Sequence, residues 1–381
     1  MNLSPRAADG SGYMLYHSIG QYPGKGAAMA SALAAFAEAW ASIEGRQWDH
    51  AFAMIGRYVA RWRGLIGAAE GTVTPTENVT AAVSAIVNGL PENYLRGRAV
   101  LVAEDCFPSN HFLLAGLAER LGFTLRTVPL RQGAAWVEDE DVIAGWTPDV
   151  GLALLTWVSS VSSHRCDLGA LVAHGRRMGS LIGVDITQAA GLLAFDVKAP
   201  AIDFAVSTSL KWTCGAPGAG MLYVAPALIP QCQPRLRGWF SQPDPFSWDI
   251  TRFSYAPDIR RFDHGTPGVM ACAATVPALD WHAGQDHEAM RAHNRNLCAQ
   301  LQAGVLAAGL SLASPTDPEA RGGSIMVRLD DAAAVAATLA RLAAAHVQAD
   351  GRGRVLRLSP GVLTGPEGIA RALDVLRKKG R

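Results

Sequence analysis

The stretch "LIGVDITQAAGLLAFDVKAPAIDFAVSTSLKWTCGAPGAGMLYVA", residues 181–225, says more about the fold than any other part of the chain. It contains three short runs, "LIGVD", "DFAVSTS" and "GMLYVA", and none of them shows the strict polar alternation of a half-buried strand. Such runs are typical of strands that are covered on both faces of a sheet. The stretch therefore predicts three buried strands close together in one sheet.

Strand-like and helix-like runs also alternate before this stretch. This order predicts an α/β fold in which a mostly parallel sheet is covered by helices on both faces. The expected strands cover residues 99–104, 124–130 and 150–157, and the expected helices cover residues 111–122 and 167–179.

The two ends of the chain differ from this central part. Two helices are predicted near the N-terminus, an irregular stretch follows the sheet, and a long helix leads into a small α+β domain. The expected elements are helices at 28–44 and 49–69, the irregular stretch at 226–267, helices at 287–308, 331–345 and 366–378, and strands at 324–329 and 355–359. We expect an N-terminal segment (1–48) that packs with the small domain, a large domain (49–268), and a linking helix with the small C-terminal domain (269–381).

Composition excludes several functional classes. The 381 residues carry a net charge of +1, with 49% hydrophobic and 18% charged residues, so neither a nucleic acid nor a membrane surface is an expected partner. Residues 1–10 contain no apolar core and therefore predict no signal peptide. The six cysteines form no CxxC pair, and no histidine cluster has zinc spacing, so we expect free thiols, a cytoplasmic protein and no metal.

Two charged residues follow neighbouring strands. Asp185 ends one strand and Lys211 comes just after the next, so both should face the crevice at the carboxyl ends of the strands. A desolvated lysine is an amine nucleophile, and a buried aspartate can pair with a cationic ring nitrogen. Pyridoxal phosphate (PLP) requires this combination. The alternative is that Asp185 caps a turn and Lys211 points into solvent.

Three further features could complete such a site. Thr76, Asn78 and Thr80 begin a helix, whose N-terminus could bind a phosphate, although they could equally form an ordinary N-cap. Phe107 follows a strand and could stack on a flat ring or simply pack in the core. Arg357 lies within an apolar strand and could bind a carboxylate or face outward.

Other signatures fit less well. The glycines of "GAPGAG", residues 215–220, precede a strand rather than a helix, so they form neither a dinucleotide fingerprint nor a P-loop. The stretch "SSVSSH", residues 159–164, is predicted to be a loop.

Several motifs together resemble the fold-type-I PLP enzymes of the aminotransferase class V group, and kynureninase most of all. The resemblance extends over nearly the whole chain. It rests on "YHSIGQYP" (16–23), "FPSNH" (107–111), "VDITQAAG" (184–191), "SLKWTCGAPGAGMLYV" (209–224), "GWF" (238–240), "FDHGTPG" (262–268) and "RLSP" (357–360). It implies the PLP fold type I and pyridoxal 5'-phosphate as the cofactor.

The resemblance also implies roles for individual residues. Lys211 would bind the cofactor covalently and Asp185 would pair with its ring nitrogen, both as catalytic residues. Further cofactor contacts would come from Phe107, Glu77, Asn78, Gln188, Ser209, Trp239 and Thr266. The substrate would contact Arg357, Ser18, His17 and Phe240. Trp239 and Thr266 usually reach the phosphate across a dimer interface, so a homodimer is implied.

Departures from the family pattern leave the reaction open. Leu210 replaces a tyrosine, Gln188 replaces a histidine and cannot titrate, Val362 replaces a tyrosine, and "WVSS" (157–160) replaces His-Val-Asn. The expected activity on an amino acid, through an external aldimine, is kynureninase-like hydrolytic Cβ–Cγ cleavage. A β-eliminating or C–S lyase and an aminotransferase are alternatives, and a non-catalytic PLP-binding protein is a third.

Overall fold

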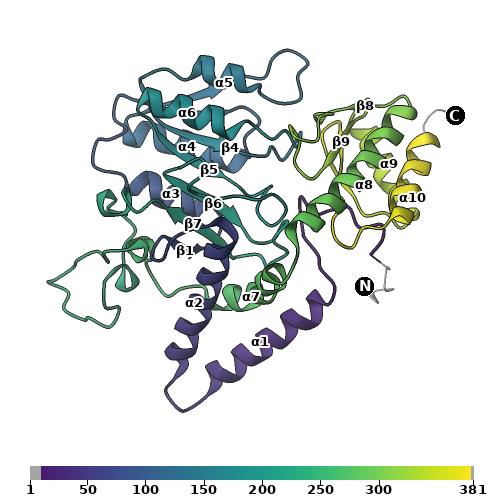
Figure 1. Cartoon of the computed structure of the whole chain (residues 1–381). Coiled ribbons are helices and arrows are strands. Elements are labelled where there is room, and N and C mark those ends of the chain that lie inside the picture. Colours follow the sequence, from purple (N-terminus) through teal and green to yellow (C-terminus); the bar gives the residue numbers. More distant parts are fainter. Residues whose placement is uncertain (1–9, 379–381) are drawn as a thin grey trace.

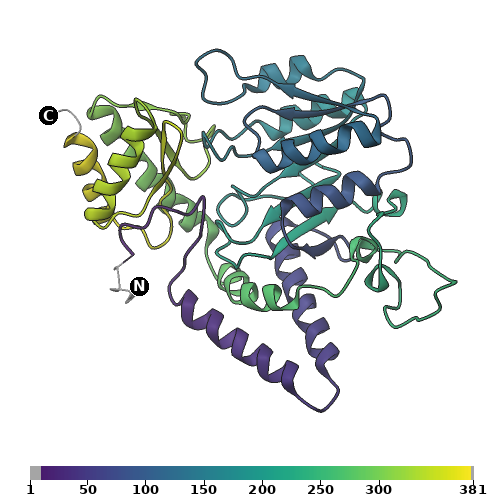
Figure 2. The same cartoon turned by 180° about the vertical axis from the view of Figure 1, so that it is seen from behind.

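The large domain is built around a seven-stranded sheet. A computed structural model describes residues 10–378 (Figures 1 and 2). The strand order is β1-β7-β6-β5-β4-β2-β3, and only β7 runs antiparallel to its neighbours. The strands are β1 (Val73–Thr76), β2 (Ala99–Ala103), β3 (Thr124–Val128), β4 (Val150–Thr156), β5 (Leu181–Asp185), β6 (Phe204–Thr208) and β7 (Gly220–Val224). The predicted mostly parallel sheet is confirmed.

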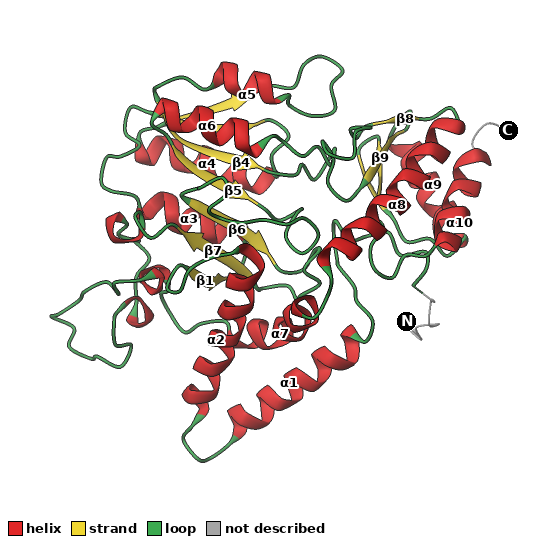
Figure 3. Ribbon diagram, in the orientation of Figure 1, coloured by secondary structure: helices red, strands yellow, loops and turns green. Residues whose placement is uncertain are grey.

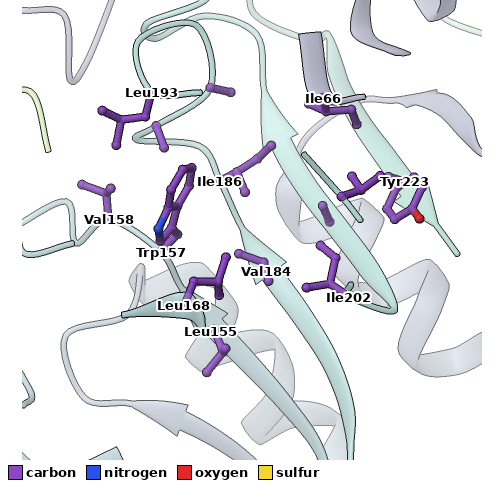
Figure 4. Close-up of a cluster of buried hydrophobic side chains, with 14 of the residues drawn as sticks. Ile66, Leu155, Trp157, Val158, Leu168, Val184, Ile186, Leu193, Ile202 and Tyr223 are labelled. Atoms are coloured by element: carbon purple, nitrogen blue, oxygen red, sulfur yellow. The ribbon is translucent and has the colours of Figure 1, made fainter. Parts of the chain in front are cut away.

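Helices cover both faces of this sheet, and strand periodicity decides which residue faces which layer. Val100 and Val102 of β2 pack in the layer that includes α3 (Val79–Gly89) and α4 (Pro108–Leu121). Leu101, between them, packs in the opposite layer with α6 (Leu168–Met178). Figure 4 shows part of this second layer, where Leu155, Val184 and Tyr223 gather with Ile66 and Leu168.

The small domain is an antiparallel sheet covered by helices, beside the carboxyl-end edge of the large sheet (Figure 3). Its strand order is β10-β11-β9-β8. Its elements are α8 (His287–Ala307), β8 (Ser311–Leu312), β9 (Ile325–Arg328), α9 (Ala332–Ala344), β10 (Asp350–Arg352), β11 (Val355–Leu358) and α10 (Pro366–Arg377). Tyr13 and Leu15 of the N-terminal segment bridge to Gln348 and Ser359 of this domain.

A pair of helices projects from the large domain. They are α1 (Lys25–Ala41) and α2 (Gln47–Ile66), and both lie against α7 (Val269–Ala283). The helix α1 is rich in alanine and other apolar residues, yet none of its residues is buried. In the predicted irregular stretch, the structure contains three short 3₁₀ helices, Ile229–Gln231, Trp239–Ser241 and Ile259–Phe262.

Some elements were not predicted from the sequence. The strand β1 contains Pro75, which tertiary pairing tolerates because β1 lies at the sheet edge beside β7. The strand β10, Asp-Gly-Arg, has low strand propensity and forms through its hairpin with β11, in which Gly353 has a φ of 54°. The helices α5 (Asp139–Gly145) and α7 were also missed; α5 is short, and α7 contains Pro277.

Other expectations concern the chain as a whole. All six cysteines are buried and unpaired, as expected. No helix within residues 10–378 has both the length and the apolarity needed to cross a membrane. The prediction that no signal peptide is present concerns a stretch whose first nine residues lie outside the described part. The domain boundaries at residues 48 and 268 stay a prediction.

The position of β5 depends on one glycine. Gly183 lies directly opposite Phe204 of β6, and a Cβ atom at this position would overlap the Phe204 ring. Gly183→Ala should therefore lower the free energy of unfolding by about 1–3 kcal/mol through overpacking. Denaturant unfolding measures the effect.

The matched control is Gly64→Ala in α2, where a new Cβ meets no atom within 4 Å. There the gain in helix propensity should leave the stability unchanged or raise it by up to about 1 kcal/mol. If both variants unfold at the same denaturant concentration, the proposed packing constraint at Gly183 is wrong.

Candidate active site

A tight turn after β6 holds the backbone of Lys211. The N–H of Cys214 donates to the Lys211 carbonyl (2.8 Å), and the N–H of Gly215 donates to the Ser209 carbonyl (2.6 Å). The N–H of Gly20 donates to the Leu210 carbonyl, so the N-terminal segment lies directly on this turn. A Cβ atom at Gly20 would overlap the Lys211 carbonyl, which explains a glycine at this position.

The Lys211 side chain turns toward the large-domain crevice rather than into open solvent. Its Nζ lies 5.2 Å from the centre of the Phe107 ring. The pKa of Lys211 is lowered from the ordinary 10.5 to about 8, mainly by burial; Asp185 opposes the shift, Arg357 and Arg352 add to it, and Asp350 opposes it weakly. An appreciable fraction of this amine is therefore neutral, and nucleophilic, near neutral pH.

Asp185 is buried at the carboxyl end of β5, and its two oxygens have separate donors. Oδ2 accepts a hydrogen bond from Asn110 Nδ2 (3.1 Å), and Oδ1 accepts one from the backbone N–H of Thr187 (2.9 Å). Asp185 thus caps the turn that follows it, as the alternative interpretation expected, while Asn110 fixes its other oxygen. Asn110 lies one turn after Phe107 in α4 and was missed as a site residue.

On the small-domain side, Arg357 is 5% exposed and already holds a carboxylate. Its Nε and Nη2 donate to Oδ1 and Oδ2 of Asp350 (2.7 and 2.6 Å), and its Nη1 donates to the Ser160 carbonyl (3.1 Å). Asp350 lies directly across the hairpin from Arg357. The predicted loop at residues 159–164 therefore contributes to the site, and Asp350 was missed because its strand was not predicted.

His17 joins the N-terminal segment to this ion pair. Its Nε2 lies 2.8 Å from Asp350 Oδ1, and its Nδ1 lies 2.5 Å from Ser359 Oγ. Burial lowers the pKa of His17 to about 4, against the opposing hydrogen bond to Asp350, so the ring is neutral at pH 7. Burial raises the pKa of Asp350, but hydrogen bonds from His17 and Arg357 outweigh it and hold the carboxyl ionised.

Gln188 is buried and links the large domain to the N-terminal segment. Its Nε2 donates to the His17 carbonyl (3.0 Å), and its Oε1 accepts from Trp212 Nε1 (3.3 Å). Gln188 therefore fixes the N-terminal segment beside Lys211. Ser18, the neighbour of His17, is partly buried, and its N–H donates to the Leu15 carbonyl.

The expected phosphate cradle contains a well-formed helix N-terminus. Asn78 caps α3 by accepting a hydrogen bond from the N–H of Ala81 (2.9 Å). The ordinary capping role is therefore present, and it leaves the positive end of the helix dipole available to an anion. Ser209 Oγ is 2.9 Å from the hydroxyl of Tyr58, a buried α2 residue whose role was missed.

Glu77, Phe240 and Thr266 lie around a different hollow. They line a cavity of about 1110 Å³ bounded by α2, α3 and residues 234–268, whose lining does not include Lys211, Asp185 or Phe107. Glu77 and Thr266 are exposed. Trp239 packs edge-on against Trp48 and Phe240, with ring centres 5.3 and 4.5 Å apart. These residues are not brought together with Lys211 within the chain.

The residues around Lys211 fit pyridoxal phosphate. Among residues 10–378, the buried atoms Asn110 Oδ1, Thr187 Oγ1 and Ser160 Oγ have no hydrogen-bond partner, and unsatisfied buried groups mark places where a ligand completes the bonding. Lys211 would hold the aldehyde carbon, Asp185 the ring nitrogen and Phe107 one ring face. Ser209 and the N-terminus of α3 would hold the phosphate.

The low pKa of Lys211 makes its reaction with the cofactor pH-dependent. We expect the rate at which apoprotein incorporates PLP at residue 211 to rise roughly tenfold per pH unit up to about pH 8 and then level off, because only the neutral amine attacks the aldehyde. Borohydride trapping followed by peptide mapping at each pH measures this rate. Lys211→Ala serves as the control and should give no adduct on this peptide. A midpoint near the ordinary lysine value would contradict the burial of the amine.

Comparison with known proteins identifies the family of this chain. The family model described as aminotransferase class-V matches residues 47–354. The chain is 30% identical over 300 residues to the kynureninase of Deinococcus radiodurans, covering 75% of this chain and 68% of that protein. It is 27% identical over 288 residues to the kynureninase of Pseudomonas fluorescens, covering 73% and 67% of the two chains.

Solved structures show the same fold. The cystine C–S lyase C-DES in complex with cysteine persulfide superimposes with a TM-score of 0.86 at 19% identity, over 97% of this chain and 98% of that chain. The cysteine desulfurase CsdA from Escherichia coli superimposes with a TM-score of 0.83 at 17% identity, over 98% and 96% of the two chains. The family match, the kynureninase relatives and the fold agree: the chain belongs to the aminotransferase class V family of fold-type-I, pyridoxal-phosphate-dependent enzymes.

Proposed function

We propose that this protein converts an amino acid by kynureninase-like hydrolytic cleavage of the Cβ–Cγ bond. The observation that carries the proposal is the amine of Lys211, which has a pKa of about 8 and faces Phe107 at the strand end next to Asp185. The kynureninases of Deinococcus radiodurans and Pseudomonas fluorescens support the choice of this reaction among those of the family.

In this proposal, residues of the chain hold the cofactor ring in place and transfer protons. Bound pyridoxal phosphate supplies an electron-accepting ring that stabilises negative charge at the substrate Cα. Asp185, oriented by the donors Asn110 and Thr187, would pair with the ring nitrogen of the cofactor. The Lys211 amine would carry the Cα proton of the substrate, and its lowered pKa suits it to accept and return that proton near neutral pH.

Arg357 is proposed to hold the substrate carboxylate, as the resemblance implies. A guanidinium has five N–H donors, of which Asp350 and Ser160 already accept three. A carboxylate at Arg357 must therefore bind through the remaining donors or replace Asp350. His17, neutral and fixed between Asp350 and Ser359, would form the wall of the same pocket with Ser18. Phe240 stays a proposed substrate contact.

A β-eliminating or C–S lyase, or an aminotransferase, is the second candidate. Two pocket positions favour it: Leu210 offers no hydroxyl for proton transfer, and both ends of the Gln188 amide are engaged by His17 and Trp212. Hydrolysis requires water to be activated beside the substrate, and neither residue can titrate to assist it.

Product analysis separates the candidates. We expect holoenzyme incubated with kynurenine to release anthranilate and alanine, and Lys211→Ala to release neither. Lys198→Ala, which removes an exposed lysine of the same domain, is the matched control and should behave as the wild type. Pyruvate and ammonia from cysteine-type substrates, without anthranilate from kynurenine, would establish the lyase instead. If no amino acid changed the visible spectrum of the cofactor, a non-catalytic role would replace both.

We also propose a cytoplasmic homodimer in which Trp239 and Thr266 reach the partner's phosphate site. The apolar helix α1 has no buried residue, and Trp248 and Ile250, beyond Trp239, are 73% and 99% exposed. A second copy of the chain would cover these surfaces, whose exposure is otherwise unfavourable. The buried, unpaired cysteines are compatible with a reducing compartment.

Replacing Trp239 tests this assignment. Trp239→Ala should weaken cofactor retention several-fold and shift the oligomer toward monomer, because the ring would no longer support the shared phosphate site. Equilibrium dialysis of PLP and light scattering measure the two effects. Trp136→Ala is the control, since that ring stacks on His164 away from the cavity. Unchanged PLP affinity in Trp239→Ala would remove Trp239 from the cofactor contacts.

A further inference from the structure

The strand β10 carries a carboxylate on the face that is turned toward the lysine pocket. Side chains alternate along a strand, so Asp350 and Arg352 project to the same side of the small sheet. The guanidinium carbon of Arg352 lies 5.7 Å from the centre of the Phe107 ring, and the same ring lies 5.2 Å from Lys211 Nζ. Asp350 is therefore on the side of β10 from which a substrate is reached.

Asp350 occupies Arg357 in the way that a bound carboxylate would. Its Oδ1 and Oδ2 accept from Nε and Nη2 of Arg357 at 2.7 and 2.6 Å, which is the two-pronged arrangement in which arginine binds carboxylates. Two carboxylates cannot use the same two donors at once. A carboxylate that binds this edge of Arg357 must therefore displace Asp350.

The two partners of this ion pair do not depend on it equally. The Arg357 side chain is 6% exposed, whereas 31% of the Asp350 side chain is exposed. A buried guanidinium that loses its carboxylate is strongly destabilising, so Arg357 needs a carboxylate at all times. Asp350 can be hydrated on its exposed side when it leaves Arg357, so it needs that partner less.

A hydrogen-bond chain holds Asp350 independently of Arg357. Ionised Asp350 can only accept, so His17 donates through Nε2 to Asp350 Oδ1 (2.8 Å). The neutral ring then accepts at Nδ1 from Ser359 Oγ (2.5 Å), and Ser359 Oγ accepts from Ser324 Oγ (2.5 Å). Asp350 therefore keeps one donor, His17, if its bonds to Arg357 break.

We propose that Asp350 is a built-in placeholder, which occupies Arg357 until the carboxylate of the substrate replaces it. The inference rests on the proposed function, which assigns Arg357 to that carboxylate. During the exchange Arg357 trades one carboxylate for another, so its buried charge stays balanced. Asp350 stays bonded to His17 and turns its other oxygen toward solvent. Substrate binding is therefore a competition within the chain, and a ligand without a carboxylate does not take part in it.

Spectral titration of the holoprotein tests the proposal, because removing a competitor and removing a supporting residue change the affinity in opposite directions. L-Alanine and L-alaninamide are titrated while the visible absorbance of the cofactor is followed. Asp350→Asn should lower the L-alanine concentration needed for half of the spectral change by at least about tenfold, because a charged competitor is removed and Asn still accepts from His17. L-Alaninamide, which has no carboxylate, should be unaffected. Taking the ratio of the two concentrations cancels any effect of the altered charge on Lys211.

Three further variants serve as controls. Asp350→Glu restores a carboxylate and should return the L-alanine affinity toward the wild-type value. In Arg357→Gln, Asp350→Asn should add no further gain, which a double-mutant cycle measures. Asp374→Asn removes an exposed carboxylate of α10 that pairs with Arg377, and it should bind both ligands as the wild type does. Cofactor content and circular dichroism establish that each variant is folded.

The outcomes separate the two proposals. Unchanged or weaker binding of L-alanine in Asp350→Asn would overturn the placeholder and make Asp350 a positioning partner of Arg357. An equal gain for L-alaninamide would also overturn it, since the gain would not depend on a carboxylate. If the wild type binds L-alanine but releases no anthranilate from kynurenine, the proposed function fails and the titration alone decides on the placeholder. If neither the wild type nor Asp350→Asn responds to either ligand, both proposals fail.

Discussion

A primary amine kept largely out of water at the carboxyl ends of β5 and β6 is the constraint on which this site depends. Removal from water disfavours the charged form of Lys211 and lowers its pKa to about 8. The same burial requires a cover, which the N-terminal segment provides: Gly20 bonds to the turn that holds Lys211, and the His17 carbonyl accepts a hydrogen bond from Gln188 of the large domain. The lowered pKa of the Lys211 amine and the packing of residues 10–23 over the turn that holds it are therefore two consequences of one arrangement.

The small domain sets the electrostatics of the site. Arg357 and Asp350 neutralise one another across a hairpin, and burial keeps His17 uncharged. This leaves Lys211 facing Asp185 from its own domain and Arg352 from the other.

The departures from the kynureninase pattern affect the two sides of the pocket differently. The positions proposed to face the cofactor, Lys211, Asp185 and Phe107, match the family pattern and lie together. Leu210 and Gln188, beside them, have lost groups that could move a proton. The binding of the cofactor and the choice of reaction are therefore separable in this chain.

The sequence by itself determined the buried strands, their alternation with helices, and the placing of Asp185 and Lys211 at one edge of the sheet. These follow from local apolar patterns and from the rule that parallel strands end together. Only the tertiary structure decided that Asp350 holds Arg357, that Asn110 holds Asp185, that Tyr58 holds Ser209, and that Arg352 reaches Phe107. The reason is physical: each of these contacts joins elements brought together by folding, and β10 itself has no strand propensity of its own. No local pattern in the sequence encodes such pairings.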